Sequence, residues 1–384
     1  MSVLSERLAA PRRQRTVKNP IPWYTPRFWH GMKFSTWIAT LASRGFPVSF
    51  SRLHTGASIT LCSGLNSAAA AVDSLVYGRR VARTELTAPP LFILGHWRAG
   101  TTFLHELLIR DPAHTYATTY QCFVPHHFVL TDRWLTPWTG RLLPSRRPMD
   151  NMAAGWQRPQ EDEFALAILG VPSPYLSMMF PDRGAVYPEY LDLHDLSSAQ
   201  LQRWKGQVMK FFRRVTYRDP RRIVVKSPPH TARVRTLLEL FPDAKFVHLV
   251  RDPYELFVST VNLWKSLNEV QRMQGLGDQL WVEEYVLSSL ERMYDAYQAD
   301  RELLADDQIY ELRYEELVEN PLERLRQIYG QLGLGDFSSV ESRIQEYLAD
   351  VKNYRPNHYE LSEEQRRVVR QRWRSYFESY GYAI

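Results

Sequence analysis

A phosphate-binding loop without its usual lysine is the first feature with a chemical meaning. Residues 91–102 read LFILGHWRAGTT, so Gly95 and Gly100 stand five positions apart after four apolar residues. The spacing is nearly that of the loop G-x-x-x-x-G-K-[ST], whose backbone N–H groups cradle phosphate at the start of a helix. Thr101 occupies the lysine position, and Arg98 lies inside the loop. The pattern favours a phosphate-like group held by arginine and hydroxyls over a metal–triphosphate site. The alternative is an ordinary strand-to-helix turn that binds no ligand, in which glycine is present only because a larger side chain would not fit.

Two other segments carry cationic side chains directly after short apolar runs. Lys226 follows the run IVV, and Arg251 follows FVHLV, with Ser259 eight residues further on. In open parallel sheets, ligands collect at the carboxyl ends of the strands, so both cations are candidates for one site. An arginine and a serine suit a second phosphate, provided that the helix carrying Ser259 runs along the site. The alternatives are a solvated lysine and, for Arg251 with Asp252, a helix cap with a surface ion pair.

Apolar strands alternate with helical segments from residue 91 onward, and this alternation predicts the fold class. We expect an α/β fold, with a central parallel sheet flanked by helices, like P-loop nucleotide-binding folds. The expected strands are 91–94, 223–225, 245–250 and 309–313, and the expected helices are 101–110, 231–241, one from Pro253, 281–303 and 320–334. The apolar run 164–180 is short for a membrane span and contains two prolines, so it predicts a core helix followed by a loop.

The first 85 residues differ in character from the rest. Residues 1 to about 25 look like a loose basic arm, and 26–46 and 63–81 have helical spacing of apolar residues. We therefore expect two parts: a basic arm with an N-terminal helical extension over 1–85, and the α/β domain over 86–384. One interpretation is an extension that packs on the core. The other is a membrane-surface or substrate-gating helix pair, which the mixture of aromatic and basic residues permits.

The amino-acid composition and charge limit the kinds of ligand or macromolecule that the chain is expected to bind. The chain has 384 residues, of which 44% are hydrophobic, and a formal net charge of +6. This positive balance suits an anionic ligand, a nucleic acid or a membrane surface, but no block of five or more basic residues supports nucleic-acid binding. Two isolated cysteines indicate no zinc site and no disulfide framework. No apolar stretch of secretory length occurs near the N-terminus, so cytoplasmic residence is expected.

Taken together, these segments resemble the sulfotransferases that use 3′-phosphoadenosine 5′-phosphosulfate (PAPS). The family's 5′-phosphosulfate loop resembles HWRAGTTFLHELL, its 3′-phosphate motif resembles RDPYELFVS, and its strand-end lysine resembles VVKSPPH. A late element, Y-E-[DE]-L-x-x-x-P, resembles residues 314–321. The four motifs occur in family order and are closest to the bacterial-type branch. The first 85 residues have no counterpart among them.

The resemblance implies roles for individual residues. The phosphosulfate and 5′-phosphate would be bound by Arg98, Ala99, Gly100, Thr101 and Thr102. Arg251 and Ser259 would bind the 3′-phosphate, and Tyr314 would lie near the adenine. Arg355, in the segment NYRPNHYEL, would touch a phosphate if that segment folds over the donor; a plain surface loop is the alternative. The donor would be PAPS, and the site would hold no metal.

Sulfuryl transfer needs cations at the leaving phosphate and a base for the acceptor proton. Arg98 and Lys226 are the candidates for the charge. Cytosolic relatives have a histidine two residues after the strand-end lysine, where this chain has Pro228. The candidates for the base are His230 and, on an equal footing, Glu161 or Glu163, with His126 or His127 as third choices. Each also has an ordinary structural interpretation, as a helix-cap acid or a core or surface histidine.

Two competing functions and the acceptor stay open at this point. A metal-dependent P-loop kinase with Asp252 as the magnesium ligand requires a lysine after Gly100, which this chain lacks. A non-catalytic, membrane-associated adaptor would keep the nucleotide-binding fold and use the N-terminal helices for binding. The acceptor would be a small molecule, lipid or carbohydrate with a hydroxyl or amine group, bound within the aromatic-rich region 112–222. A peripheral membrane contact through the N-terminal helices is a further option.

Overall fold

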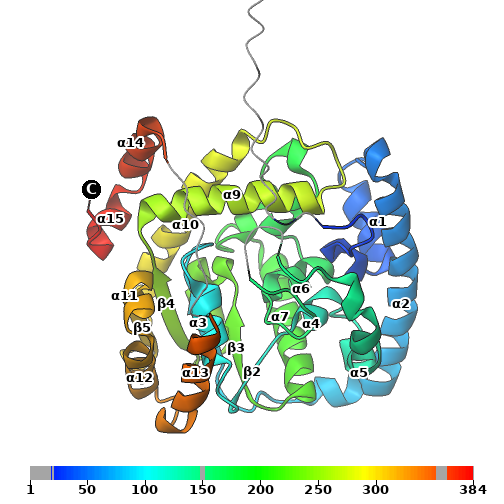
Figure 1. Cartoon of the computed structure of the whole chain (residues 1–384). Coiled ribbons are helices and arrows are strands. Elements are labelled where there is room, and N and C mark those ends of the chain that lie inside the picture. Colours follow the sequence, from blue (N-terminus) through cyan, green and yellow to red (C-terminus); the bar gives the residue numbers. More distant parts are fainter. Residues whose placement is uncertain (1–18, 20, 148–151, 352–360, 384) are drawn as a thin grey trace, which may run out of the picture.

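The computed structural model describes residues 19, 21–147, 152–351 and 361–383. Within these residues, five strands form one parallel sheet in the order β2-β3-β1-β4-β5 (Figure 1). The strands are β1 (Leu91–Leu94), β2 (His114–Tyr116), β3 (Arg222–Lys226), β4 (Lys245–Val250) and β5 (Ile309–Arg313). The predicted parallel α/β fold is therefore confirmed. The three-residue edge strand β2 was not predicted.

The register of the central strands brings the three predicted segments to one edge of the sheet. Ile93 of β1 pairs with Lys226 of β3, and Leu94 pairs with His248 of β4. Because the strands are parallel, their carboxyl ends face the same way. The glycine loop after β1, Lys226 at the end of β3 and Arg251 just after β4 therefore emerge side by side.

Both faces of the sheet are buried, as a parallel sheet covered by crossover helices requires. Phe92 and Leu94 of β1 face one hydrophobic cluster, while Leu91 and Ile93 face another. The second cluster is closed by helices α3 (Thr101–Leu108), α12 (Pro321–Leu332) and α13 (Ser338–Val351). The first, larger cluster is closed by helices that include α7 (Ser198–Arg218), α8 (Val234–Leu240), α9 (Pro253–Gln271) and α10 (Trp281–Arg301).

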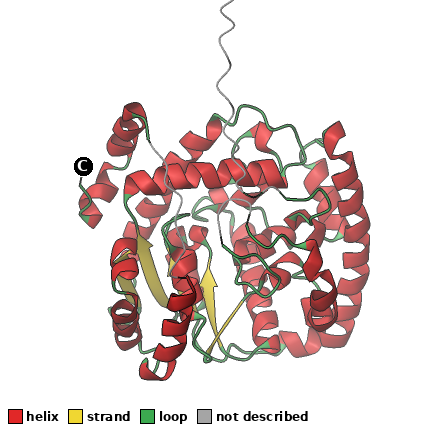
Figure 2. Ribbon diagram, viewed as in Figure 1, coloured by secondary structure: helices red, strands yellow, loops and turns green. Residues whose placement is uncertain are grey.

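Helices make up most of the structure outside the sheet (Figure 2). The remaining α-helices are α1 (Phe34–Ala42), α2 (Leu53–Ala82), α4 (Thr119–Phe123), α5 (Phe128–Thr139), α6 (Asp162–Ile168), α11 (Tyr314–Glu319), α14 (Glu363–Arg372) and α15 (Arg374–Tyr380). The short 3₁₀ turns are η1 (Phe28–Gly31), η2 (Phe50–Arg52), η3 (Gly140–Leu142), η4 (Pro174–Met178), η5 (Pro181–Arg183), η6 (Pro188–Tyr190) and η7 (Pro228–Ala232). The expected helix over 231–241 begins later, at Val234, because two prolines open the 3₁₀ turn η7 instead.

The N-terminal segment packs against the α/β core. Trp29 and Trp37 are fully buried, and both belong to the hydrophobic cluster that also contains Phe92 of the central sheet. The Trp29 indole Nε1 donates a hydrogen bond to the backbone oxygen of Gln271, at 2.8 Å. The expected boundary near residue 86 stays a prediction. The packing indicates that residues 28–82 and the sheet bury their apolar surface together.

Replacing Trp29 by alanine should therefore destabilise the whole protein. The change removes a fully buried indole and a buried hydrogen bond, and such truncations cost about 3–5 kcal/mol. We expect a loss of this size in the free energy of unfolding, measured by urea denaturation. Trp23, which is 77% exposed, provides the control, and Trp23→Ala should change stability by less than about 0.5 kcal/mol. Equal effects of the two variants would contradict a shared core.

Candidate functional site

The loop after β1 is held in place by contacts that only glycine allows. Gly95 has φ 138°, and a Cβ there would lie 2.6 Å from the backbone oxygen of Leu249 on β4. Gly100 has φ 96°, and a Cβ there would lie 2.2 Å from Cδ2 of Tyr314. The Gly95 N–H donates to Oγ1 of Thr231, at 2.7 Å. The loop is thus packed between β4, η7 and α11, with helix α3 beginning at Thr101.

Two sequence motifs predicted to share a ligand meet at this loop. The Arg98 Nε donates to Oγ of Ser259 at 3.0 Å, and the Arg251 Nη1 donates to the Arg98 backbone oxygen at 3.1 Å. The Arg251 guanidinium also lies 4.6 Å from the ring centroid of Tyr314. Its Nε is buried and has no hydrogen-bond partner among the described residues. Guanidinium groups, hydroxyls and a helix N-terminus are groups that can bind an anion, and here they lie together.

The C-terminal helices fix the end of strand β4. The hydroxyl of Tyr376 on α15 accepts a hydrogen bond from the Arg251 N–H at 3.0 Å and donates one to the Arg251 backbone oxygen at 3.1 Å. The Asp252 N–H donates to Oε1 of Glu315 on α11, at 3.0 Å. These contacts fix the position of the backbone at Arg251 and Asp252, and therefore the point from which the Arg251 side chain reaches the loop.

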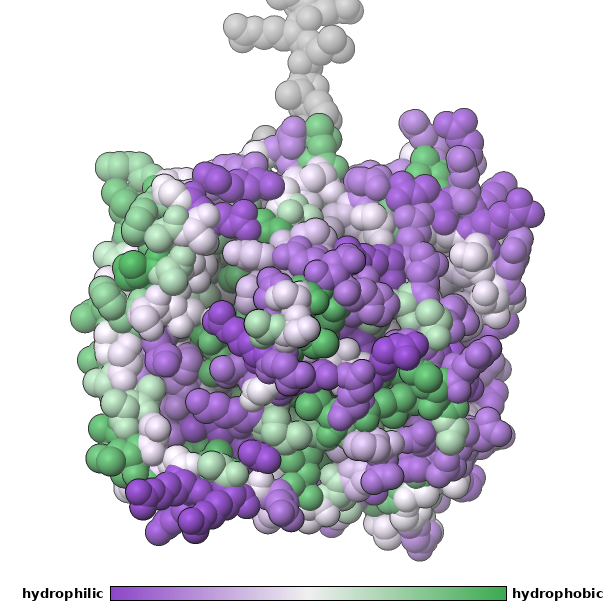
Figure 3. Space-filling view, turned by 180° about the vertical axis from the view of Figure 1, so that it is seen from behind, coloured by the Kyte–Doolittle hydropathy of each residue, from purple (hydrophilic) through white to green (hydrophobic). Residues whose placement is uncertain are grey.

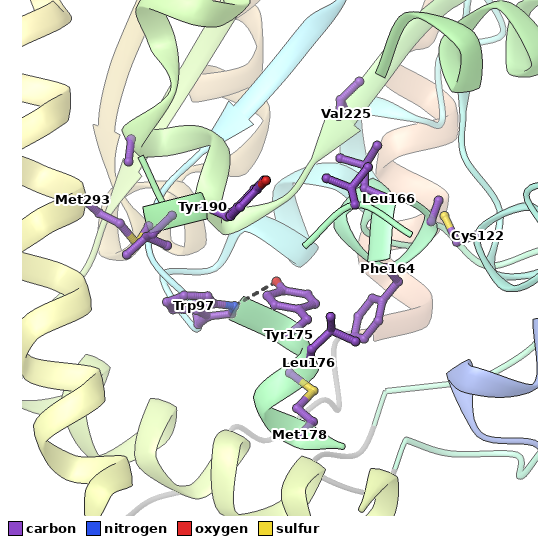
Figure 4. Packing of buried hydrophobic residues seen from close by; sticks show 14 of the residues in the cluster. Trp97, Cys122, Phe164, Leu166, Tyr175, Leu176, Met178, Tyr190, Val225 and Met293 are labelled. Carbon is purple, nitrogen blue, oxygen red and sulfur yellow. Dashed lines mark hydrogen bonds between the residues drawn. The ribbon is translucent and has the colours of Figure 1, made fainter. Parts of the chain in front are cut away.

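A chain of hydrogen bonds links the glycine loop to a carboxylate. The Lys226 Nζ donates to Oε1 of Glu161 at 2.5 Å, and the Tyr175 hydroxyl donates to Oε2 of Glu161. The Trp97 indole Nε1 donates to the Tyr175 hydroxyl at 2.9 Å, as the dashed line in Figure 4 shows. Burial raises the pKa of Tyr175 well above its usual value, and the Glu161 carboxylate raises it further. Tyr175 is therefore a fixed hydrogen-bond donor to Glu161.

Lys226 is the cation nearest to this carboxylate. Its side chain is almost completely buried, and burial lowers the pKa of its ammonium group, while the Glu161 carboxylate acts in the opposite direction. Breaking the pair would leave a buried, uncompensated charge, which is costly. The pair thus holds a base and an acid together at the carboxyl edge of the sheet.

The other candidates for the base are engaged in buried structural contacts. His230 is fully buried, and its Nε2 lies 2.9 Å from Oδ2 of Asp162. Glu163 is also buried; it accepts hydrogen bonds from Arg233 at 2.7 Å and from Ser173 at 2.5 Å. These pairs tie α6 to η7 and to the loop before η4.

His126 and His127 contact elements other than the loop. The Nε2 of His126 lies 3.3 Å from the backbone oxygen of Ile168, and burial lowers its pKa to about 3. The Nε2 of His127 lies 3.1 Å from Oδ1 of Asn66 on α2, and burial lowers its pKa to about 4. Both rings therefore link α-helices of the core.

The structure brings most of the predicted residues to one place. Ala99 and Thr101 are buried, whereas Thr102 is half-buried. Arg355 lies outside the described residues. Trp97 is not among the predicted site residues, and Tyr175 belongs to them only as one of the aromatic residues in the region expected to bind the acceptor. No local pattern marks them, because their roles come from contacts across 78 and 14 residues.

A cavity of about 540 Å³ lies beside the segment that leads to Glu161. One wall comes from α3 and β2, including Glu106 and Tyr116, and another from Thr136 and Pro137 of α5. The segment 155–159 completes the lining, two residues before Glu161. The cavity is thus within the region 112–222 in which acceptor contacts were expected, apart from its α3 wall.

The parallel sheet, with its glycine loop leading from β1 into α3, gives the chain a P-loop-like architecture. The family model described as "Sulfotransferase family" matches residues 89–339, which is more than half of the chain. The chain belongs to the sulfotransferase family, and it is a transferase enzyme. PAPS is the donor typical of this family.

Curated relatives match over nearly the whole chain. The omega-hydroxy-beta-dihydromenaquinone-9 sulfotransferases Stf3 of Mycobacterium bovis and Mycobacterium tuberculosis are each 42% identical to this chain over 365 residues. The match covers 94% of this chain and 92% of each relative, so the N-terminal helices are included.

Solved structures share the fold. The sulfotransferase STF9 of Mycobacterium avium superposes with a TM-score of 0.66 at 18% identity, covering 92% of this chain and 98% of that chain. The sulfotransferase STF1 of Mycobacterium tuberculosis gives a TM-score of 0.61 at 19% identity, covering 90% and 94%. At these identities the likeness concerns the fold.

Gly100→Ala should damage the anion loop. The alanine methyl group would overlap the Tyr314 ring, and the positive φ is strained for any L side chain. We expect a loss of about 1–3 kcal/mol in stability, measured by thermal unfolding, and weaker binding of the donor product, 3′-phosphoadenosine 5′-phosphate.

Gly206→Ala is the matched control for this substitution. Gly206 lies inside α7, and nothing lies within 4 Å of a Cβ built there. Alanine should stabilise this helix by up to about 1 kcal/mol without affecting ligand binding. The strain argument for the loop fails if both glycine variants behave alike.

Proposed function

We propose that this chain transfers the sulfuryl group of PAPS to a hydroxyl group of a lipid acceptor, of the hydroxylated menaquinone type. The observation that carries the proposal is the convergence of Arg98, Ser259 and Arg251 at the glycine loop, beside the Lys226–Glu161 pair. The two arginines can hold the two phosphate groups of the donor, and the Glu161 carboxylate beside them can accept a proton.

The donor would be held by two groups of residues. Arg98, Ala99, Gly100, Thr101 and Thr102 would bind the 5′-phosphosulfate through side chains and the N–H groups at the start of α3. Ser259 and Arg251 would bind the 3′-phosphate, with Tyr314 near the adenine. The Arg251 Nε, which finds no acceptor within the described part of the chain, supports this assignment, since a buried guanidinium N–H is costly without an acceptor. Arg355 stays a candidate phosphate contact.

In the transfer, a bond forms between the acceptor oxygen and sulfur, while the bond from sulfur to the phosphate oxygen breaks and its electron pair goes to 3′-phosphoadenosine 5′-phosphate. Arg98 and Lys226 would stabilise the negative charge that develops on the departing phosphate. Glu161 would accept the proton of the acceptor hydroxyl. Tyr175 would act as a positioning residue, because its hydroxyl holds one oxygen of Glu161.

Several contacts favour Glu161 as the base over the other candidates. Its carboxylate adjoins Lys226 at the strand end and is linked to the loop through Tyr175 and Trp97. Its side chain also retains 15% exposure, which leaves room for contact with a ligand. His230 and Glu163, by contrast, are almost completely buried in pairs with other side chains.

The acceptor class rests on the relatives. Their name states that they act on a hydroxylated dihydromenaquinone, and the 42% identity extends over 92% of each of those proteins. The cavity beside residues 155–159 is a candidate position for part of such an acceptor, because it adjoins the segment leading to Glu161. A hydroxyl acceptor also matches the need for a base at this point.

Binding of 3′-phosphoadenosine 5′-phosphate should stabilise the protein in the presence of EDTA. At 100 times its Kd, a ligand adds about 2.7 kcal/mol to the free energy of unfolding, which a thermal shift detects. The shift should be lost in Arg251→Ala. Arg374→Ala is the matched control, because Arg374, like Arg251, pairs with a glutamate four residues later. A shift seen only with ATP and magnesium would contradict the donor assignment.

Glu161→Gln should lower kcat by about 10²–10⁴ while the affinity for the donor product stays unchanged. Glu239→Gln, which breaks an exposed Lys205–Glu239 pair, is the control and should retain full activity. If Glu161→Gln stays within tenfold of the parent enzyme and His230→Gln does not, the base is His230.

A further inference from the structure

Helix α2 has its polar and apolar faces reversed relative to an ordinary surface helix. The buried positions on its inner face include Thr55, Ser63, Asn66 and Asp73. The large hydrophobic side chains exposed on its outer face are Leu53, Leu61, Leu65, Val72, Leu75 and Val76. Leu61 is 70% exposed and Leu75 is 87% exposed. Soluble proteins rarely present such a continuous apolar stripe without a partner.

Specific hydrogen bonds fix the inner face of α2 to the body of the protein. Asp73 pairs with Arg214 of α7 at 2.9 Å, and its Oδ2 accepts the Leu130 N–H of α5 at 3.0 Å. The Asn66 amide donates to the backbone oxygens of His30 and Met32. The outward direction of the leucines is therefore set by the fold and does not reflect a loosely attached helix.

Residues 50–82 are long and apolar enough to cross a membrane by length and composition. A spanning orientation would, however, carry the buried Asp73–Arg214 pair and the attached helices α5 and α7 into hydrocarbon. The geometry instead suits a helix that lies in the plane of an interface with only its outer face in contact with lipid. At ~1.5 Å per residue, the helix would offer a stripe about 45 Å long.

Helix α5 contacts α2 and extends the apolar surface. Trp134 is 74% exposed and Trp138 is 83% exposed, and they stand four residues apart on one face of the helix. Tryptophan favours the boundary between water and lipid, where its ring is buried and its N–H stays solvated. Figure 3, seen from behind, shows hydrophobic side chains gathered along the left edge, on the side where α2 lies.

The charges around this surface are mostly positive, although the exposed Glu85 lies just after the end of α2. Between residues 19 and 84 the sequence contains a single acidic residue, Asp73, which is buried. The basic residues there that are exposed or half-buried are Lys33, Arg44, Arg52, Arg79, Arg80 and Arg83. Arg133, Arg141 and Arg146 add three exposed cations on and just after α5. Basic residues beside an interfacial helix are attracted to anionic lipid headgroups.

We propose that the outer faces of α2 and α5 form a docking surface for an anionic membrane, with α2 lying parallel to the bilayer plane. The proposal stands on the reversed helix and its basic surroundings and does not depend on the identity of the acceptor. It has a consequence for any lipid acceptor, because Thr136 and Pro137 of α5 line the cavity beside residues 155–159. A lipid leaving the bilayer at α5 would be next to that cavity.

The test uses the full chain and sedimentation with vesicles of phosphatidylcholine alone or with 30% phosphatidylglycerol. Binding should require the anionic lipid and weaken as salt rises. The double variant Leu61→Gln/Leu75→Gln should bind at least about tenfold more weakly, since each exposed leucine would lose its burial in lipid. The control is the double variant Leu303→Gln/Val318→Gln. Both residues are exposed; Leu303 lies just after α10, and Val318 lies on α11. Helix α11 is on the opposite side of the molecule from α2 (Figure 1).

A second pair of variants tests the electrostatic contribution of the basic residues to membrane binding. Arg79→Gln/Arg80→Gln should lower affinity for the anionic vesicles by about fivefold per arginine. The control is Arg366→Gln/Arg367→Gln, another adjacent arginine pair, on α14. All variants should keep the parent melting temperature.

Three results would overturn the proposal. The first is an absence of vesicle binding by the parent protein. The second is equal binding to neutral and anionic vesicles. The third is a dimer in size-exclusion chromatography that the leucine variants dissociate, because a second copy of the chain would then be the occupant of this surface.

Discussion

The parallel pairing of β3, β1 and β4 is the constraint on which the site depends. Ile93 stands opposite Lys226 and Leu94 opposite His248, so the three strands end within a few residues of one another. A shift of one residue in either pairing would turn the strand-end side chains to the other face of the sheet. The glycine loop, the lysine and the arginine occupy one edge because this register holds them there.

Close packing then converts this edge into a shaped site. Tyr314 fills the space beside Gly100, and Tyr376 holds both backbone polar groups of Arg251. Trp97 connects the loop to Tyr175, and Tyr175 connects to Glu161. A ligand that moved the loop would therefore also act on the orientation of the carboxylate, because hydrogen bonds through Trp97 and Tyr175 connect the two.

The sequence predicts the parts of this arrangement that are local. The loop from Gly95 to Thr102 could be predicted because its conformation depends on glycine spacing and on the strand before it. The fold class followed from alternating periodicities, and Arg251 and Ser259 followed from an eight-residue spacing. The residues that could not be assigned are those whose roles depend on distant partners.

His230 and Glu161 illustrate this limit. Both were candidates for the base, and nothing in their local sequence separates them. The fold buries His230 against Asp162, 68 residues away, and leaves Glu161 beside Lys226, 65 residues away. The strand β2 was missed for a related reason, since three residues are too few for a periodic pattern to appear.

The long-range pairing of the N-terminal helices has a consequence for the folding of the chain. Trp29 finds its acceptor 242 residues later, and Asp73 finds Arg214 only after 140 intervening residues have been made. During synthesis, α2 is therefore made before α5 and α7, which supply the partners of Asp73. Until then, the aspartate is unpaired and the leucines of α2 are exposed. Contacts of such high sequence separation form slowly and leave apolar segments open to association in the meantime. Helices α1 and α2 are therefore synthesised well before the residues that complete their native contacts.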